Sequence, residues 1–360
     1  MALLEYKCPN CGAALQYEAG TQEMTCPYCD SSFAIEELGD LAGDLDQDKA
    51  SEALEWSYDG QDWMAGEQEG MAVYACNSCG GEIIGDETLG ATSCPFCGNR
   101  VVITSKFSGS LRPDLVVPFK LKKEDALKAL EKHYAGKRLL PRVFKDKNHL
   151  DEIKGVYVPF WLFDADVGVR ALYDATKVRR WSDSDYNYTE TSHYQVRRQG
   201  DIGFDQVPVD GSQSVDDTLM ESLEPFHLSE AVDFQTAYLA GYFANKYDVD
   251  AETCSARAHE RVRNSASSAF ENTVKGYHSV SVDQENIRLD KGYVHYALLP
   301  VWLLSTSWEG QNFLFAMNGQ TGKLVGDLPM DKKLRRSWFF KIFGIAAVIL
   351  VAISQLLAGR

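Results

Sequence analysis

Positive charge is scarce in this sequence. Its 360 residues include 36 Lys and Arg against 52 Asp and Glu, which leaves a formal net charge of −16. A protein that binds nucleic acid through its backbone needs clustered Lys and Arg to neutralise phosphates, so the composition argues against that class. The acidic surface also has a simpler interpretation, because net charge keeps a protein soluble.

The familiar catalytic signatures are missing as well. There is no GxxxxGK[ST] phosphate loop, no HExxH helix and no GxSxG turn, and GQTGKL at residues 319–324 does not have the spacing of the first. The histidines show no ligand spacing, and Asp164 with Asp166 fits the solvated end of a strand better than a magnesium site. We therefore expect neither a helicase nor an ATPase, and keep a hydrolase of unknown class as an alternative.

A secretory leader is not evident either. The opening residues, MALLEYKCPNCG, contain neither a basic stretch nor a long apolar run. Nine cysteines could suggest a disulfide scaffold, but eight of them fall in C-x-x-C pairs. Such pairs suit metal binding in a reducing cytosol better than disulfides. The ninth, Cys254, is expected to be a small core residue.

The paired cysteines form two groups with the same spacing. Fourteen residues separate the pairs in each group, and every cysteine of the second group follows its counterpart by 68 positions, which indicates a duplication. Four thiolates on two knuckles make a tetrahedral zinc site without an open position for water. Iron in a rubredoxin-like site and redox-active disulfides are the alternatives. The predicted ligands of two structural Zn²⁺ ions are Cys8, Cys11, Cys26 and Cys29, and Cys76, Cys79, Cys94 and Cys97.

Composition changes divide the chain into six ranges. Residues 40–69, between the cysteine groups, hold ten acidic residues and one lysine, with Trp56, Tyr58 and Trp63 among them. A solvated spacer with some helix is the favoured interpretation, and a docking segment for a basic partner is the alternative. The predicted ranges are a zinc ribbon at 1–39, an acidic linker at 40–69, a second zinc ribbon at 70–108, a central α+β domain at 112–330, a basic juxtamembrane segment at 331–341 and a transmembrane helix at 342–358.

Periodicity in the central range predicts three amphipathic helices among strands. They lie at 122–136, within 225–247, and near 251–275, where Cys254, Ala258, Val262, Ala266 and Phe270 form a stripe. Polar residues 181–198 and the turn NGQTGK at 318–323 predict hairpins. The tetrapeptides at 118–121 and 225–228 match each other, as do those at 159–162 and 300–303. A duplicated central domain would explain both matches, and chance is the other explanation.

The C-terminal segment is long and apolar. Residues 342–358 contain nothing more polar than Ser354 and Gln355, and a spanning helix needs ~20 apolar residues, or as few as ~17. Five Lys and Arg precede this segment and only Arg360 follows it. The positive-inside rule then predicts a single-pass protein of the cell membrane with its N-terminal bulk in the cytoplasm. A helix lying flat in the interface is the alternative.

Several motifs carry a family resemblance: the cysteine knuckles, VPFWLFDADV (158–167), VPVDGS (207–212), LMESLEPF (219–226), LPVWLL (299–304) and FAMNGQTGKLVGDLP (315–329). The chain resembles bacterial membrane proteins with TFIIB-type zinc ribbons. Members are often labelled primosomal helicase-like, a label that the missing motor motifs argue against. Because such proteins tend to occur beside a phage-shock protein A homologue, the resemblance implies a membrane-tethered scaffold in envelope stress.

The expected fold class is thus α+β, with two N-terminal all-β zinc ribbons, a central mixed domain and one C-terminal transmembrane helix. The expected function is non-enzymatic: a membrane-anchored cytoplasmic adaptor that recruits protein partners, with a phage-shock protein A-type system among the candidates. A nucleic-acid-binding regulator tethered to the membrane is the alternative.

Overall fold

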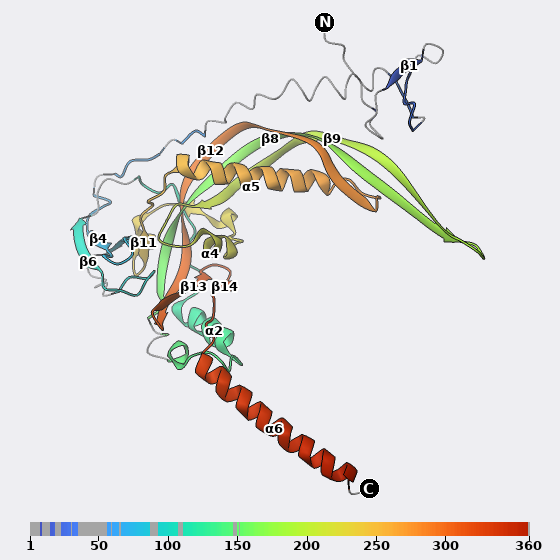
Figure 1. The fold of residues 1–360 in the computed structure, drawn as a ribbon. Helices are drawn as coiled ribbons and strands as arrows, with labels where there is room; N and C mark the ends of the chain where they lie inside the picture. The colour runs from blue at the N-terminus through green and yellow to red at the C-terminus, as the bar shows by residue number, and fades with distance from the viewer. Residues whose placement is uncertain are drawn as a thin grey trace. The chain divides into compact units, whose positions relative to one another are not determined.

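The computed structural model of the chain describes residues 8, 15–18, 23–29, 31–34, 56–58, 60–64, 66–86, 93–106, 111–146, 150 and 152–358. The fold is α+β, as predicted: a small N-terminal sheet, a large mixed sheet and an apolar C-terminal helix (Figure 1). Contacts divide the chain into two compact units of three segments each. Unit 1 comprises Met1–Tyr58, Leu162–Pro208 and Ser255–Val294; unit 2 comprises Asp59–Trp161, Val209–Cys254 and His295–Arg360. The domain ranges inferred from composition stay predictions.

The strands are β1 Gln16–Glu18, β2 Glu23–Thr25, β3 Ser32–Ala34, β4 Met71–Ala75, β5 Glu82–Asp86, β6 Val102–Lys106, β7 Leu115–Val116, β8 Lys154–Ser182, β9 Asn187–Asp210, β10 Val232–Asp233, β11 Phe243–Asn245, β12 Ser279–Trp308, β13 Gln311–Asn318 and β14 Leu324–Val325. The helices are α2 Lys123–Tyr134, α4 Asp217–Ser222, α5 Ala251–Glu271 and α6 Lys332–Ala358, with short 3-10 turns η1 Arg142–Lys145, η2 Leu228–Glu230 and η3 Thr236–Leu239.

The first cysteine group lies on a sheet of its own. Strands β1, β2 and β3 pair antiparallel in that order. Leu15, Met24 and Phe33 pack beside the buried Cys8 and Cys26. So small an apolar cluster cannot stabilise a separate sheet by burial alone, which is the usual reason for a metal in such a module.

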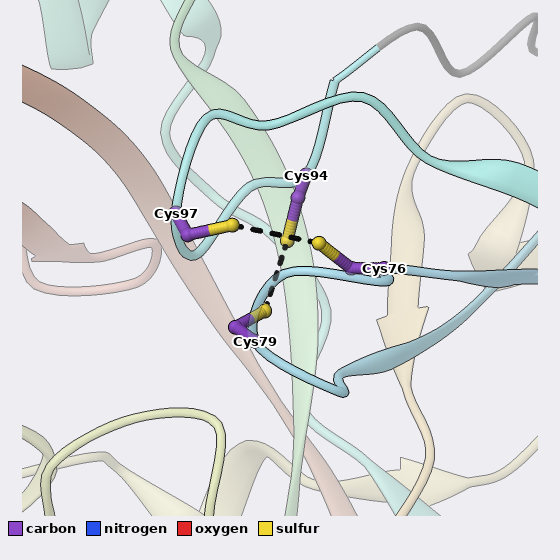
Figure 2. A group of neighbouring side chains, drawn as sticks. All are labelled: Cys76, Cys79, Cys94 and Cys97. Atoms are coloured by element: carbon purple, nitrogen blue, oxygen red, sulfur yellow. Dashed lines mark hydrogen bonds between the residues drawn. The ribbon is translucent and has the colours of Figure 1, made fainter.

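The second cysteine group lies on strands that continue into a larger sheet. Strand β4 pairs antiparallel with β5 and β6, and Figure 2 shows the four cysteines that these strands position. On its other edge β5 pairs with β11, where Ala244 lies opposite Ile84. Ile83 of β5 is fully buried. The second ribbon is therefore an edge of the unit 2 sheet and not a self-contained module.

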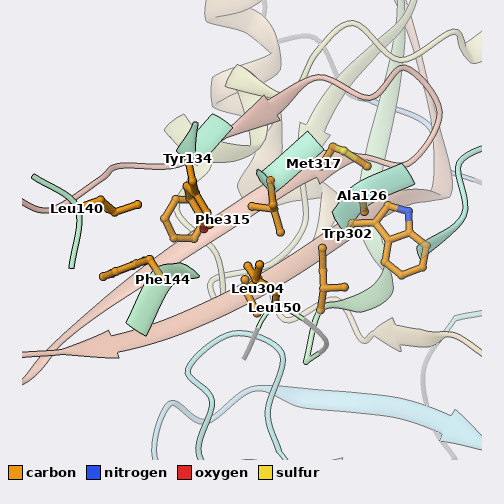
Figure 3. Close-up of a cluster of buried hydrophobic side chains, with 11 residues drawn as sticks. Ala126, Tyr134, Leu140, Phe144, Leu150, Trp302, Leu304, Phe315 and Met317 are labelled. Carbon is orange, nitrogen blue, oxygen red and sulfur yellow. The ribbon is translucent and has the colours of Figure 1, made fainter. Parts of the chain in front are cut away.

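A hydrophobic core of unit 2 lies between α2 and the paired strands β12 and β13 (Figure 3). Helix α2 presents Ala126, Leu130 and Tyr134, spaced four residues apart, to Trp302 and Phe315 of these strands. Spacing of four places side chains on one helix face, so the periodicity that predicted this helix also identified its buried side. Leu127 packs at the margin of the same cluster.

The core of unit 1 lies between α5 and the long strands beside it (Figure 1). Odd-numbered residues of β8 from Ala165 to Ala175 face this core, as alternation in a strand requires. The predicted stripe of α5 is buried at Ala258, Val262 and Ala266. This helix prediction is confirmed, as is the hairpin of β8 and β9, whose turn follows Ser182.

Part of the acidic segment is not a solvated spacer. In unit 1, Trp56 packs edge-on against Phe163, with ring centroids 4.8 Å apart, and against His259. In unit 2, Trp63 packs against Phe234 at 5.7 Å. In the sequence, the aromatic residues among the acidic ones are the feature that indicates packing against the folded units. Residues 40–55 lie outside the described ones, so the helix expected there is not tested.

The helix predicted within 225–247 is wrong. The segment forms the turns η2 and η3 and the strands β10 and β11. Strand β10 pairs with β7, and β11 pairs with β5 and β8. Gly241 has φ +83°, a conformation outside any right-handed helix. Partners far away in the sequence override the local helical pattern, because their hydrogen bonds and burial exceed the small differences in propensity.

Two sets of contacts in unit 2 repeat one another. The amide of Gly211 donates to the carbonyl of Pro159 over 3.0 Å, and the amide of Gly319 donates to that of Pro300 over 2.8 Å. Each proline opens the matching tetrapeptide inside a long strand, β8 or β12. This half of the predicted repeat is confirmed.

The tryptophans of these tetrapeptides also make equivalent bonds. Nε1 of Trp161 donates to the carbonyl of Val249 over 2.9 Å, and Nε1 of Trp302 donates to that of Leu121 over 3.2 Å. Each acceptor stands two residues before a helix, α5 or α2 respectively. The counterpart of Leu121 is thus Val249, and the match to Leu228 suggested by the sequence is wrong.

The repeat therefore consists of a first copy, β7–α2–β8–β9, and a second copy, β11–α5–β12–β13. Strand β7 of the first copy pairs in parallel with β12 of the second. Strand β11 of the second copy pairs in parallel with β8 of the first. Each copy completes its sheet with the short strand of the other.

Candidate metal centres

The cysteines of the second group converge on one point (Figure 2). The Sγ atoms of Cys76 and Cys97 are 3.5 Å apart, and those of Cys79 and Cys94 are 3.7 Å apart. All four lie within 4.8 Å of one another. Zn–S bonds of ~2.3 Å in a tetrahedron require S···S distances of about 3.8 Å, whereas a disulfide requires ~2.05 Å. The thiols thus have the separation of metal ligands and not of disulfides.

Two equivalent knuckles hold these thiols. The Cys76 amide donates to the Gly81 carbonyl over 3.0 Å, and the Gly80 amide donates back to Cys76 over 2.9 Å. In the other knuckle Gly98 donates to Cys94 over 2.9 Å. Gly80 and Gly98 have φ +77° and +74°, a region that side chains with a Cβ avoid. The glycine after the second cysteine of each pair is therefore required by the turn.

Polar residues that the cysteine pattern does not reveal surround this site. Asn99 donates from Nδ2 to Ser78 Oγ over 2.8 Å, which ties one knuckle to the other, and also to Cys97 Sγ over 3.5 Å. The ammonium group of Lys154 bonds Ser93, next to Cys94. A metal with four thiolates carries net negative charge, so these donors stabilise the loaded site. Near the cysteines, the only trace of these donors in the sequence is one polar residue, Asn99, two positions after Cys97.

The protonation states of the thiols differ. Burial raises the pKa of Cys79 to about 11, and burial also raises the pKa of Cys94. Burial acts on Cys76 too, but the amides of Cys79 and Ser78 outweigh it and lower its pKa to about 7. A metal must therefore displace protons from Cys79 and Cys94 as it binds.

The first group shows the same local design in the residues described. The Sγ atoms of Cys8 and Cys29 are 3.5 Å apart, and Cys26 completes a cluster within 4.8 Å. The Cys26 amide donates to the Ser31 carbonyl over 2.9 Å. The Cys76 amide makes the equivalent bond to the carbonyl of Gly81, which is also five residues further along the chain. The hydrogen bond with Ser31 lowers the pKa of Cys29 to about 6. Cys11, the fourth predicted ligand, lies outside the described residues.

Both clusters could hold metal ions by this chemistry. The second offers four thiols in a closed tetrahedron, and the first offers at least three. A site closed by four cysteines leaves no position for a substrate or water and suits a structural ion. Cys254 lies apart from both clusters: it is buried in α5, and its Sγ donates to the Asp210 carbonyl over 3.4 Å.

A pair of equivalent polar turns ends β9 and β13, the last strands of the two copies. In the first copy Asp210 Oδ1 accepts from the Ser212 amide over 3.1 Å. In the second copy Asn318 Oδ1 accepts from the Gln320 amide over 2.9 Å. Asn318 also donates two hydrogen bonds to carbonyls, whereas Oδ2 of Asp210 is buried without a partner among the described residues. Burial, together with Asp217 and Asp248, raises the pKa of Asp210 to about 8.

The chain is similar to the uncharacterized protein YdjG of Bacillus subtilis (strain 168). The two are 34% identical over 359 residues, which is 99% of each chain. The chain belongs to the YdjG family. No family model and no solved structure matches it. Because the similarity to YdjG runs from end to end, the whole arrangement of this YdjG-family chain, cysteine groups, central repeat and apolar helix, falls within the matched length.

Proposed function

We propose that the chain is a membrane-anchored adaptor whose two zinc ribbons and central domain recruit protein partners at the cytoplasmic face. The observation that carries this proposal is the closed four-cysteine site built into the edge of the unit 2 sheet. A metal there has no open position for chemistry. Its effect is to fix the strands and loops around it, which is what a binding surface needs.

Zinc is the proposed metal at both sites. The thiol separations match a tetrahedral ion with Zn–S bonds of ~2.3 Å, and four-cysteine sites with C-x-x-C spacing are typical of zinc ribbons. The resemblance to TFIIB-type ribbons points the same way. Iron in the same tetrahedron is distinguished by its visible absorption, which zinc lacks.

The proposed anchor is α6. The candidate span Lys332–Gln355 has 24 residues, and an 18-residue stretch within it has a mean hydropathy of 2.1 with none of that stretch buried. An exposed apolar stretch of this length costs free energy in water and suits the hydrocarbon core of a bilayer. Asp331 caps the helix by accepting from the Lys333 amide over 2.7 Å. The Lys and Arg that follow favour the cytoplasm for the N-terminal bulk.

Purification of the tagged full-length chain from native membranes in mild detergent, in parallel with and without nuclease treatment, tests the adaptor role. We expect one or a few proteins at near-stoichiometric amounts, retained at moderate salt. Resemblance makes a phage-shock protein A-type protein the first candidate to probe. Recovery of nucleic acid with a steep dependence on salt would instead support the tethered regulator.

A further inference from the structure

Strand β13 has an open edge in unit 2. On one side the strand pairs with β12 along its whole length. On the other side β14 pairs only with Ala316 and Met317, and the Asn318 amide closes the turn by donating to Lys323. Of the eight residues of β13, the five at 311–315 thus have no neighbouring strand on that side among the described residues.

The direction of the backbone groups follows from this register. Backbone groups of an antiparallel strand point alternately to one neighbour and the other. Since Asn318 bonds toward β14, the backbone groups of Leu314 and Asn312 point to that same side. Gly326, just after β14, lies against the Leu314 carbonyl, where a Cβ on Gly326 would be 3.1 Å from the oxygen. The Leu314 amide and both backbone groups of Asn312 are therefore the groups that face the open edge. An unpaired strand edge is a template for another extended chain.

A groove of about 540 Å³ lies along this edge. Asn312, Phe313 and Leu314 form one wall, and Thr218, Leu219 and Ser222 of α4 form the other. Figure 1 shows α4 close to β13 and β14. Leu219, Leu314 and Val325 are half-buried and give the groove apolar surface.

The charge of the groove has one sign. Asp216 and Asp327 line it and are exposed, and none of its lining residues is a Lys or Arg. The nearby Lys323 is turned away, with Nζ donating to the Glu224 carbonyl over 2.6 Å. Opposite charge on a ligand is therefore favoured and like charge disfavoured.

We propose that this groove binds an extended peptide segment of a partner, one that alternates apolar and basic side chains, as an added strand along β13. Main-chain bonds to Asn312 and Leu314 supply affinity, and the side chains supply specificity. Five residues at ~3.4 Å each set the length of the paired segment at about 17 Å. The inference rests on the adaptor role and gives it a class of partner.

A fluorescent octapeptide of alternating valine and lysine is the probe, used with the full-length chain in detergent. We expect saturable binding by anisotropy, at least 10-fold weaker binding of the valine–glutamate counterpart, and slower hydrogen exchange of the Asn312 and Leu314 amides on binding. The double variant Asp216→Asn/Asp327→Asn should weaken binding 5-fold or more. Glu124→Gln/Glu131→Gln, which removes two exposed charges on α2, is the matched control and should bind as the wild type does.

Asn312→Pro removes one outward amide without touching the bonds to β12, and should also weaken binding. Absence of binding, equal affinity in the charge variant, or binding without protection of residues 312 and 314 would overturn the proposal. Protection of these amides without peptide, in a chain that runs as a dimer, would identify a second copy as the occupant. If the synthetic peptide does not bind, the groove proposal fails by itself. The adaptor role is decided separately, by whether partners are recovered from membranes.

Discussion

The two copies place different residues at one turn, and the difference is chemical. Asn318 and Asp210 accept the same backbone hydrogen bond, but Asn318 is neutral and its amide donates to two carbonyls. Asp210 is buried near Asp217 and Asp248, and its pKa is raised to about 8. The first copy therefore carries an ionisable group where the second copy is uncharged at any pH.

This difference predicts a pH-dependent effect of Asp210→Asn. The unfolded chain releases the Asp210 proton near pH 4, whereas the folded chain keeps it up to about pH 8. Between these values the unfolded state binds fewer protons, so the contribution of Asp210 to stability falls as pH rises, by at most ~1.4 kcal/mol per pH unit. The variant should match the wild type near pH 4.5 and unfold at a higher temperature at pH 8.

Thermal unfolding of both proteins at several pH values measures the effect. Asp205→Asn, at an exposed site on the same strand, controls for the loss of one carboxylate. A difference between Asp210→Asn and the wild type that does not change with pH, or a less stable variant at pH 8, would show that Asp210 is charged in the folded chain.

At the scale of elements, the two cysteine groups have different neighbours. The first holds a three-stranded sheet that pairs with no other described strand. The second holds β4 and β5, and β5 continues through β11 to β8. Loss of metal from the second group should therefore spread through the sheet, whereas loss from the first should stay local.

Cys94→Ser and Cys26→Ser test this contrast. Each variant should lose one of two zinc ions, since structural zinc contributes ~10–16 kcal/mol in isolated finger peptides and three ligands hold it poorly. Hydrogen exchange should rise in Cys94→Ser at β5, β11 and the adjoining part of β8. In Cys26→Ser it should rise at β1–β3 alone. Metal analysis measures the zinc content of each variant, and hydrogen-exchange mass spectrometry measures how far the exchange increases along the chain. Identical, local increases in the two variants would contradict the contrast.

What the sequence could predict depended on how local the cause was. The cysteine spacing and the four-residue stripes of α2 and α5 reflect contacts within one turn or one helix face, so they were visible in the pattern. The strands β10 and β11 form because of partners more than 80 residues away, and no local pattern records them. Proline usually stands at a strand boundary or an edge, yet Pro159 and Pro300 both lie inside long strands, where a glycine amide bonds their carbonyls.

At the scale of the whole molecule, neither compact unit is a continuous piece of chain. The strands β8 and β12 and the helix α5 each contribute residues to both units. The C-terminal segment after β14 can be removed without cutting any described strand. That makes α6 suitable for a test by truncation.

Removal of residues 338–360 should move the protein from the membrane to the soluble fraction with its metal content intact. Alkaline carbonate should leave the full-length chain in the membrane, because a spanning helix is held by the bilayer core and not by charge. Protease added to intact cells should leave the ribbons uncut. Release of the full-length chain by carbonate would favour a helix lying in the interface, and external cleavage of the ribbons would reverse the topology.

The reciprocal pairing of β7 with β12 and of β11 with β8 has a consequence for descent. A chain with a single copy would own a short strand and a long strand that do not pair with each other. Two such chains could pair all their strands by exchanging the short ones, so that the short strand of each chain lies beside the long strand of the other. An obligate, symmetric homodimer is then the natural ancestor. Fusion of the two genes would have made that exchange intramolecular and independent of concentration, and freed the two halves to diverge, as Asp210 and Asn318 have done.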